Sequence, residues 1–463
     1  MTNAKHLNDY SLDWSRLESF FVQNKGYRYA RRKDTYVLPL PTREPERSKF
    51  ENGFWPITGG LARLLSNDSI VPEKDNLDMS HILSIGKFDS TETYEWFQHF
   101  LQSQQRKVEE TDVSRLSQLP LLTLSEQKER TGQVDFINYV YGALIEGNED
   151  ELSPLFTDDD SDDLLTQIFR STQLAKEGSY ISPYPCLFPN IKEQFKQDLI
   201  HLSQNPKFFL DNLNHLLVHY TFIMISQTVL QTNRFTKFNH EQMMPIFFLM
   251  EWEKGARWRT SYTNGYKLLK EQSKDFYKHE HALNIVCQAP ALQPKKNLYY
   301  HHIDEILTSS SEDVLNTYIQ SLYDWMNNFY TKYKAIETPK YASDRTLDDA
   351  FRDLAEAIST GLNKELKSRY PAALEAFVLK FYKKHGGSLG SLLAVNQEQL
   401  LALIACSIKQ EKIELNKLWH ELEARGLFFD HHSKEEIVGL LDKLNYLEKK
   451  SDSGDAQYVK SIL

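Results

Sequence analysis

Apolar residues recur at every third or fourth position through most of this chain, the spacing that places them on one face of an α-helix. The pattern dominates after residue 164, where Asp211 is a candidate N-terminal cap for a long helix. Ser311 and Asp349 are candidate caps of later helices. Tyr370-Pro371 interrupts the pattern, because the residue before a proline avoids helical angles. We therefore expect a mainly α, multidomain protein.

The N-terminal part shows shorter helical patterns and few strand signals. Four segments have helical spacing: residues 14–22, 61–65, 94–101 and 136–145. Between the first two lie a basic, aromatic stretch from Lys25 to Lys33 and three prolines, which predict extended backbone. We expect residues 1–145 to form a mixed, mostly helical N-terminal domain.

Residues 376–463 show the clearest pattern. Helical spacing covers about 397–408 and 414–425, and a third helix follows Ser433-Lys-Glu-Glu436, which has the capping-box pattern. Two short apolar segments then flank the turn residues 451–455 and predict a β-hairpin. Three helices followed by a hairpin predict a C-terminal winged helix-turn-helix domain.

The chain carries 64 acidic residues against 54 Lys and Arg, a net charge of −10, and most of this excess lies in one tract. Residues 146–163 contain nine acids and no base. Like charges at this density repel one another, so we interpret residues 146–175 as an acidic linker. It separates the N-terminal domain from a helical middle domain at 176–375. The tract lacks the central glycine and final glutamate of an EF-hand loop, so we expect no calcium site there.

The expected cellular compartment follows from features that the sequence lacks. No stretch reaches the ~18 consecutive apolar residues of a membrane helix, and the N-terminus has no apolar segment of a secretory signal. The three cysteines, Cys186, Cys287 and Cys406, lie far apart and suit a reducing compartment. We expect a cytoplasmic protein with structural thiols and no membrane partner.

Motifs that carry catalytic chemistry are absent or incomplete. No Gly-x-x-x-x-Gly-Lys-Ser/Thr phosphate loop occurs, and His240-Glu241 is followed by Met244 where a zincin helix needs its second histidine. Asp112 with Glu126-x-Lys128 is a formal match to a nuclease in which two carboxylates hold a divalent metal. The pattern is degenerate. We expect no cofactor, no metal, and neither ATP hydrolysis nor DNA cleavage by the chain alone.

Two basic segments have the composition of a nucleic-acid surface, where Lys and Arg contact phosphates and aromatic rings stack on bases. One is Lys25–Lys33, and the other is Arg234–Tyr300, which has eleven bases against six acids. In the second segment, arginines stand on either side of a tryptophan. The DNA-binding candidates of the chain are Lys254, Arg257, Trp258, Arg259, Arg31, Arg32, Lys449 and Lys450.

The predicted winged helix has balanced charge. Residues 376–463 contain twelve Lys or Arg and twelve Asp or Glu. Its third helix, which usually reads DNA in such domains, carries Lys434 and Lys443 but also three acids. We therefore expect protein–protein docking at least as much as DNA reading, with Lys449-Lys450 in the hairpin as the best phosphate candidates.

Four segments of the C-terminal region resemble one known family. They are Gly386-Gly-Ser-Leu-Gly390, Asn396-Gln-Glu-Gln-Leu400, Glu423-Ala-Arg-Gly-Leu-Phe-Phe-Asp430 and Glu448-Lys-Lys-Ser-Asp-Ser-Gly-Asp-Ala-Gln-Tyr-Val459. Together they resemble the end of the DptG (DndG) family of DNA phosphorothioation-dependent restriction proteins. The run that ends at Val459 is the most specific, and the chain length also suits the family.

The resemblance implies a role in bacterial antiviral defence. In such systems sulfur replaces a non-bridging phosphate oxygen in host DNA, and a restriction complex acts on DNA that lacks this mark. Members of the family work with two partners, DptF and DptH, which carry the ATPase chemistry. The resemblance thus implies a non-catalytic complex subunit that acts on DNA, and it supplies no catalytic residue. The alternatives are a winged-helix transcription regulator and a divalent-metal nuclease built on Asp112, Glu126 and Lys128.

Overall fold

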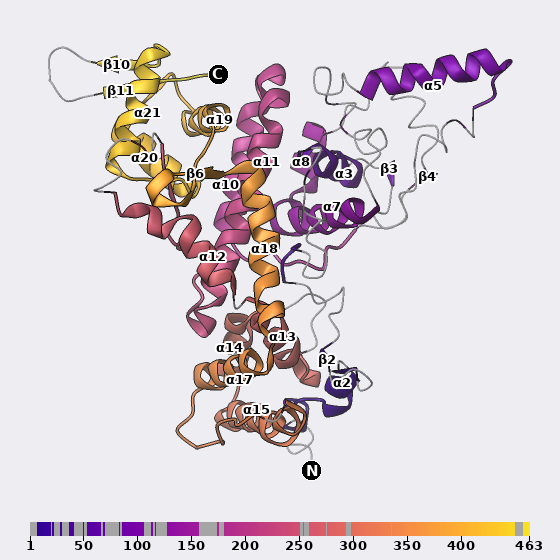
Figure 1. The fold of residues 1–463 in the computed structure, drawn as a ribbon, viewed down its shortest axis with the longest axis vertical. Helices are drawn as coiled ribbons and strands as arrows, with labels where there is room; N and C mark the ends of the chain where they lie inside the picture. The colour runs from indigo at the N-terminus through magenta and orange to yellow at the C-terminus, as the bar shows by residue number, and fades with distance from the viewer. Residues whose placement is uncertain are drawn as a thin grey trace.

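The computed structural model describes most of the chain after residue 180 and parts of the region before it. The described residues are 7–19, 21–22, 28–29, 37–40, 50, 53–65, 68–69, 83, 86–105, 113, 116, 127–156, 174–175, 180–250, 253, 259–274, 276–292, 298–334, 336–449 and 457–463. They are mainly helical, as the sequence predicts, and their strands are short. Helices α11 (Pro206–Thr232) and α18 (Lys364–Phe381) run through the middle of the molecule, between the N-terminal helices and the C-terminal elements (Figure 1).

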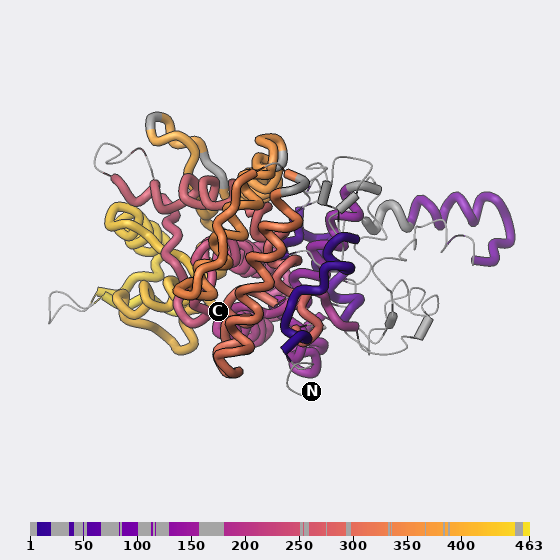
Figure 2. The backbone as a smooth tube through the Cα atoms, turned by 90° about the horizontal axis from the view of Figure 1, so that it is seen from below, coloured from indigo at the N-terminus to yellow at the C-terminus, as the bar shows by residue number. Residues whose placement is uncertain are grey.

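The N-terminal elements lie on one side of these two helices (Figure 1). They are α2 Trp14–Ser19, β1 Phe21–Val22, β2 Arg28–Tyr29, α3 Trp55–Leu65, β3 Asp68–Ser69, α5 Thr91–Gln105, α7 Gln127–Val140, the π-helix η6 Tyr141–Ile145, α8 Glu149–Phe156 and β4 Leu174–Ala175. The helices predicted around 61–65, 94–101 and 136–145 are confirmed, whereas the one predicted over 14–22 ends at Ser19. Helix α5 extends away from the body (Figures 1 and 2).

The first part of the acidic tract is folded. Helix α8 holds three acids in its first turn, where the helix dipole favours negative charge. Leu152 and Phe156 of α8 are buried, and the helix contacts α3 and α10 (Pro189–Ser203). Residues 149–156 are thus a packed helix rather than the expected solvated linker, because these two apolar side chains anchor them to the core. Residues 157–173 lie outside the described part.

The middle region is a series of helices joined by short connections. After α10 and α11 come η7 Phe235–Lys237, β5 Phe247–Phe248, η8 Ser261–Asn264, α12 Tyr266–Lys274, α13 Phe276–Val286, η9 Pro290–Leu292, α14 Tyr300–Thr308, α15 Glu312–Trp325, the π-helix η10 Met326–Tyr330, α16 Thr331–Lys334 and α17 Leu347–Gly361. Helices α13, α14, α15 and α17 gather at the lower end of the molecule in Figure 1. Among the described residues, no helix combines the length and apolar character that a membrane crossing requires.

Side-chain caps set the helix starts in this region. Ser311 caps α15, as predicted. The start predicted at Asp211 is wrong, because the side chain of Asn205 already caps α11 and a proline follows it at the first helical position. Asp349 is not a cap either. Thr346 caps α17, and Asp349 completes a capping box as the third helical residue.

Helix α18 continues through Tyr370-Pro371, where the sequence predicts an interruption. A proline inside a helix removes one backbone hydrogen bond and costs about 3 kcal/mol. The buried side chains of Tyr370, Leu374 and Phe377 offset this cost by packing on both sides of the proline. The boundary predicted between residues 375 and 376 therefore falls inside one continuous helix.

A continuous hydrophobic core joins the N-terminal helices to the centre of the molecule. Phe377 of α18 lies in it and is fully buried. Its ring stacks on Phe136 of α7, with ring centroids 5.7 Å apart, and on Phe222 of α11 at 6.3 Å. The edge of Phe50 approaches it at 5.2 Å. Segments far apart in the sequence thus share one core.

The C-terminal unit, residues 397–463, follows the hairpin of β6 Lys383–His385 and β7 Ser391–Leu393, whose turn holds η11 Gly387–Leu389. Its elements are α19 Gln397–Ser407, β8 Lys412–Glu414, α20 Leu415–Ala424, β9 Phe428–Phe429, α21 His431–Lys443, β10 Leu447–Lys449 and β11 Gln457–Lys460. The predicted helices and the β10–β11 hairpin are confirmed. Strand β8, which the sequence does not predict, extends the hairpin to an antiparallel sheet with the order β10-β11-β8.

The third helix of this unit begins earlier than predicted. Asp430 caps α21 by accepting a hydrogen bond from the backbone N–H of Ser433, so the helix starts at His431 rather than after Ser433. Just before it, β9 pairs in parallel with β5 of the middle region, Phe428 opposite Phe247. Helix α19 also contacts α10 and α11. The C-terminal unit is therefore attached to the middle region along several elements.

Candidate nucleic-acid interface

Arg259, one of the predicted DNA contacts, lies inside the protein. Its side chain is 1% exposed, and its Nε and Nη2 atoms each donate to a carboxylate oxygen of Asp430 at 2.8 Å. Nη1 donates to the carbonyl of Met250 at 3.0 Å, and Nη2 also donates to Ser433 Oγ at 2.7 Å. A guanidinium held in this way does not reach a DNA phosphate. The assignment of Arg259 to a DNA surface is therefore corrected: it joins the start of α21 to the middle region.

Asp430 completes this junction. Besides Arg259 it binds the Ser433 N–H at 2.9 Å and accepts a hydrogen bond from Ser261 Oγ at 2.8 Å. Burial by itself raises the pKa of Asp430, but the hydrogen bonds from Arg259, Ser433 and Ser261 bring that pKa below its ordinary value. The carboxylate is therefore charged at neutral pH, and the ion pair persists.

Arg259→Ala is expected to lower the free energy of unfolding by about 2–3 kcal/mol, because Asp430 would lose its charged partner while its serine contacts remain. DNA affinity of the folded protein is expected to stay unchanged. Urea denaturation and a DNA titration measure the two quantities. As a control, Arg345→Ala removes an arginine that is paired with Asp353 at 3.6 Å in a more exposed position, and should cost less than about 1 kcal/mol. A variant with normal stability and reduced DNA affinity would contradict the assignment.

Of the other predicted contacts, the structure describes Lys449, and it lies apart from Arg259. Lys449 is exposed on β10, with Nζ 3.5 Å from Asp442 Oδ2. Arg259 contacts the first turn of α21, whereas Lys449 follows its last turn, and a helix of this length spans roughly 20 Å. Six candidates lie outside the described residues: Arg31, Arg32, Lys254, Arg257, Trp258 and Lys450.

Helix α21 carries three acids and two lysines, of which Lys443 is exposed next to Asp442 in the sequence. Glu435 and Asp442 are exposed on this helix. Lys434 does little to offset them, since its Nζ lies 3.3 Å from Glu423 Oε1 and 5.3 Å from the ring centroid of Trp419. A helix with an excess of acids is less suited to phosphates than to a basic protein surface.

Helix α12, which lies within the predicted basic segment Arg234–Tyr300, forms a basic surface together with the end of α18 and the β6–β7 hairpin, and this second part is not predicted from the sequence. Helix α12 contacts both α18 and β7, and Figure 1 shows it beside α18. Exposed lysines lie on α12 and at the end of α18, just before the hairpin. A signal for this surface exists in the sequence, because residues 376–397 contain three lysines and no acid. It is hidden when charge is summed over all of 376–463.

A buried polar cluster links α10 and α11 to the C-terminal unit. Arg425 donates two hydrogen bonds to the carboxylate of Asp198, both at 2.7 Å, and Tyr220 donates a third at 2.6 Å. His219 Nε2 lies 2.7 Å from the Arg425 carbonyl oxygen, and burial lowers the pKa of His219 to about 4, so its ring is neutral. These residue types also occur in active sites, but all four are buried. The cluster joins elements and is closed to a substrate.

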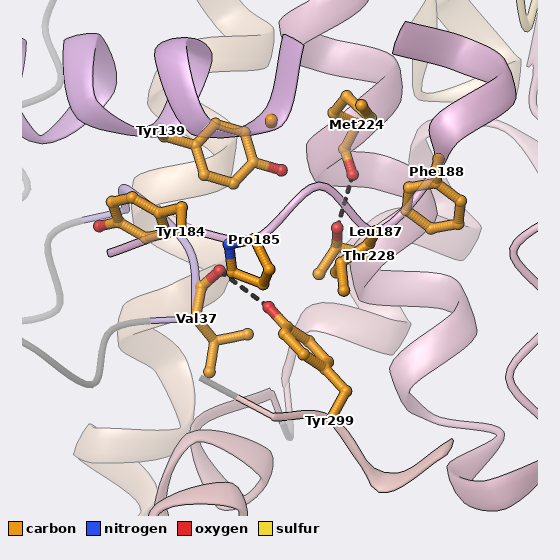
Figure 3. Close-up of a pocket in the computed structure, with 10 residues that line it drawn as sticks. Val37, Tyr139, Tyr184, Pro185, Leu187, Phe188, Met224, Thr228 and Tyr299 are labelled. Atoms are coloured by element: carbon orange, nitrogen blue, oxygen red, sulfur yellow. Dashed lines mark hydrogen bonds between the residues drawn. The ribbon is translucent and has the colours of Figure 1, made fainter. Parts of the chain in front are cut away.

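A pocket between α7, α11 and the segment before α10 is lined by four hydroxyl-bearing side chains and by apolar groups (Figure 3). The gaps between these side chains add up to about 220 Å³, but each gap is too narrow for a water molecule. Tyr299 donates to the Val37 carbonyl at 3.2 Å, and Thr228 donates to the Met224 carbonyl at 2.7 Å. Burial raises the pKa of Tyr139 and of Tyr299. The pocket is too narrow to hold a ligand in this structure.

Sequence comparison adds no relative to this geometry. No family model matches the chain, and no curated protein matches it. The C-terminal motifs and the surfaces described above therefore carry the functional argument.

A metal-dependent nuclease site and a reactive cysteine find no support in the described part of the chain. Lys128 lies in helix α7, whereas a nuclease of the predicted type needs its lysine on a strand; Asp112 and Glu126 lie outside the described residues. Within those residues, no three His, Cys, Asp or Glu side chains are grouped to hold a metal ion. The cysteines are free, and burial raises the pKa of Cys287 to about 12, which leaves its thiol protonated.

Proposed function

We propose that this chain is a non-catalytic subunit of a bacterial DNA phosphorothioation-dependent restriction complex of the DptG (DndG) type. It acts together with DptF and DptH family ATPases on DNA that lacks the phosphorothioate mark. The observation that carries the proposal is the sequence from Gly386 to Val459, whose four segments resemble that family. The sequence also lacks a phosphate-loop motif, which fits a subunit that leaves ATP hydrolysis to its partners.

The resembling segments coincide with caps and turns of the C-terminal region. Asn396 caps α19, and Asp430 caps α21. Gly390 and Gly426 have positive φ, of 76° and 82°, which a residue with a side chain rarely adopts. The backbone conformation at the two caps and the two glycines restricts which residue types can occupy these positions. The resemblance therefore supports a shared fold of this unit, and the shared role is part of the proposal.

The C-terminal unit is, in this proposal, a winged helix-turn-helix that docks onto a protein. Helices α19, α20 and α21 precede the β10–β11 hairpin, and β8 between the first two helices completes the sheet. That order supports the winged-helix assignment. The excess of acids over lysines on α21 favours a basic protein partner and weighs against a transcription regulator, whose third helix would have to approach DNA.

Co-purification tests the proposal. The tagged full-length chain, isolated from its native cell, is expected to bring down DptF and DptH family ATPases in comparable amounts, measured by mass spectrometry. Glu435→Lys/Asp442→Lys should reduce their recovery roughly tenfold or more, because the reversed charges would repel a basic partner. The matched control Glu365→Lys/Glu398→Lys reverses two exposed glutamates away from α21 and should retain them.

Two outcomes would count against these statements. A chain that purifies without either ATPase contradicts the proposed function. Equal recovery with both pairs of substitutions contradicts the docking role of α21.

A further inference from the structure

Three lysines form a stripe along helix α12. Lys267, Lys270 and Lys274 are spaced by three and four residues, which places them on one side of the helix. Lys267 is exposed, and the side chains of Lys270 and Lys274 are 44% and 51% exposed. At 1.5 Å rise per residue the stripe is about 10 Å long.

The stripe continues onto the neighbouring hairpin. Helix α12 packs against α18 and β7. Lys380 is exposed at the end of α18, Lys383 and Lys384 follow on strand β6, and His385 is exposed at the end of that strand. No acid occurs between residues 376 and 397. The two elements therefore present one basic surface.

Two acids lie within this surface, and each is already paired. Glu375 Oε2 lies 3.5 Å from Lys270 Nζ, and Glu271 Oε1 lies 2.7 Å from Lys274 Nζ. The hydrogen bond from Lys274, together with the charges of Lys267 and Lys270, lowers the pKa of Glu271. Four lysines, Lys267, Lys270, Lys274 and Lys380, thus stand against two glutamates across α12 and the end of α18.

The shape and chemistry of this surface point to a long polyanion. The lysines follow two adjoining elements instead of converging on one point, as a single phosphate group would require. These four lysines act as point charges and lack the planar fork with which arginine reads a guanine edge. Such a surface contacts phosphates and does not distinguish bases.

We infer that the surface of α12 and the β6–β7 hairpin binds the phosphate backbone of DNA without sequence preference. The choice of DNA over other polyanions rests on the proposed function. The contact would hold the complex on DNA while another subunit does the chemistry. The winged helix, whose third helix carries more acids than lysines, would face a protein instead.

Salt-dependent binding of the full-length chain to a short mixed-sequence duplex, followed by fluorescence anisotropy, tests this inference. If about four lysines contact phosphates, affinity should fall on the order of 10²-fold between about 50 and 200 mM salt. Lys267→Ala/Lys274→Ala/Lys380→Ala should make the slope of log affinity against log salt shallower by about 3 and weaken all duplexes alike. The matched control Lys207→Ala/Lys340→Ala/Lys417→Ala removes the same charge from exposed positions elsewhere and should leave the slope unchanged.

The other outcomes overturn the inference. An equal loss of DNA affinity in both triple variants would mean that binding depends only on the net charge of the protein. A larger loss in Lys434→Ala/Lys443→Ala/Lys449→Ala would place DNA on the winged helix. Binding of poly-glutamate in preference to DNA would make the ligand an acidic protein.

This test and that of the proposed function can fail separately. A chain that recovers DptF and DptH but does not bind DNA would overturn this inference and leave the proposed function standing. A chain that binds DNA through α12 and the hairpin but recovers neither ATPase would support this inference and contradict the proposed function.

Discussion

Arg425→Ala is expected to lower the free energy of unfolding by about 3–5 kcal/mol, the usual cost of breaking a buried ion pair. The side chains of Arg425 and Asp198 are both 0% exposed. Arg425 also donates to the Glu421 carboxylate at 2.8 Å and to the Cys406 carbonyl at 3.0 Å. The substitution would leave Asp198 charged in the interior, with only neutral hydrogen-bond donors to stabilise it.

Urea denaturation measures this effect, and two further variants identify its cause. Arg369→Ala breaks a pair at the protein surface, with Glu365 one helical turn away, and should cost less than about 1 kcal/mol. Arg425→Met combined with Asp198→Asn removes both charges and should regain part of the loss, because no unpaired charge then remains buried. If Arg425→Ala unfolds within about 1 kcal/mol of the wild-type chain, the C-terminal unit is not held by this pair.

Phe377→Ala should also cost about 3–5 kcal/mol, because it would leave a cavity among rigid aromatic neighbours. Phe136, Phe222 and Phe50 surround the ring and belong to three different segments. No single helix can move to fill the space without losing its other contacts. The same denaturation experiment measures the loss.

Leu379→Ala is the matched control for Phe377→Ala. Leu379 lies on the same helix but is 60% exposed, so its truncation should change the stability by less than about 0.5 kcal/mol. Similar losses for the two variants would mean that α18 is sensitive along its whole length rather than through the core that Phe377 joins.

The elements that could be predicted from the sequence are those set by neighbouring residues. Ser311 caps a helix through an N–H three residues away, and the β10–β11 hairpin depends on a local turn. Strand β8 has three residues, too few to produce an alternating pattern, and it is a strand only because β11 pairs with it. The proline within α18 predicts a helix break that does not occur. The packing that keeps the helix continuous comes from other segments, so the local sequence does not show it.

The error at Arg259 shows why surfaces are harder to predict than helices. A basic segment looks like a nucleic-acid surface in the sequence, and nothing local marks which of its charges is buried. The partner, Asp430, is 171 residues away, and Arg425 lies 227 residues from Asp198. Conversely, the lysines of α12 and the hairpin belong to separate segments, so only the fold shows that they form one surface.

The distances along the chain between these paired charges also order the events of biosynthesis. Asp198 emerges from the ribosome 227 residues before Arg425, which at about 5–20 residues per second is an interval of roughly 10–45 s. During that time a carboxylate that ends up in the interior has no cation to bind, and β5 has no partner strand. The buried ion pair of Asp198 therefore cannot form until Arg425 has been synthesised. A message truncated near its end would yield a protein that chaperones and proteases treat as unfolded.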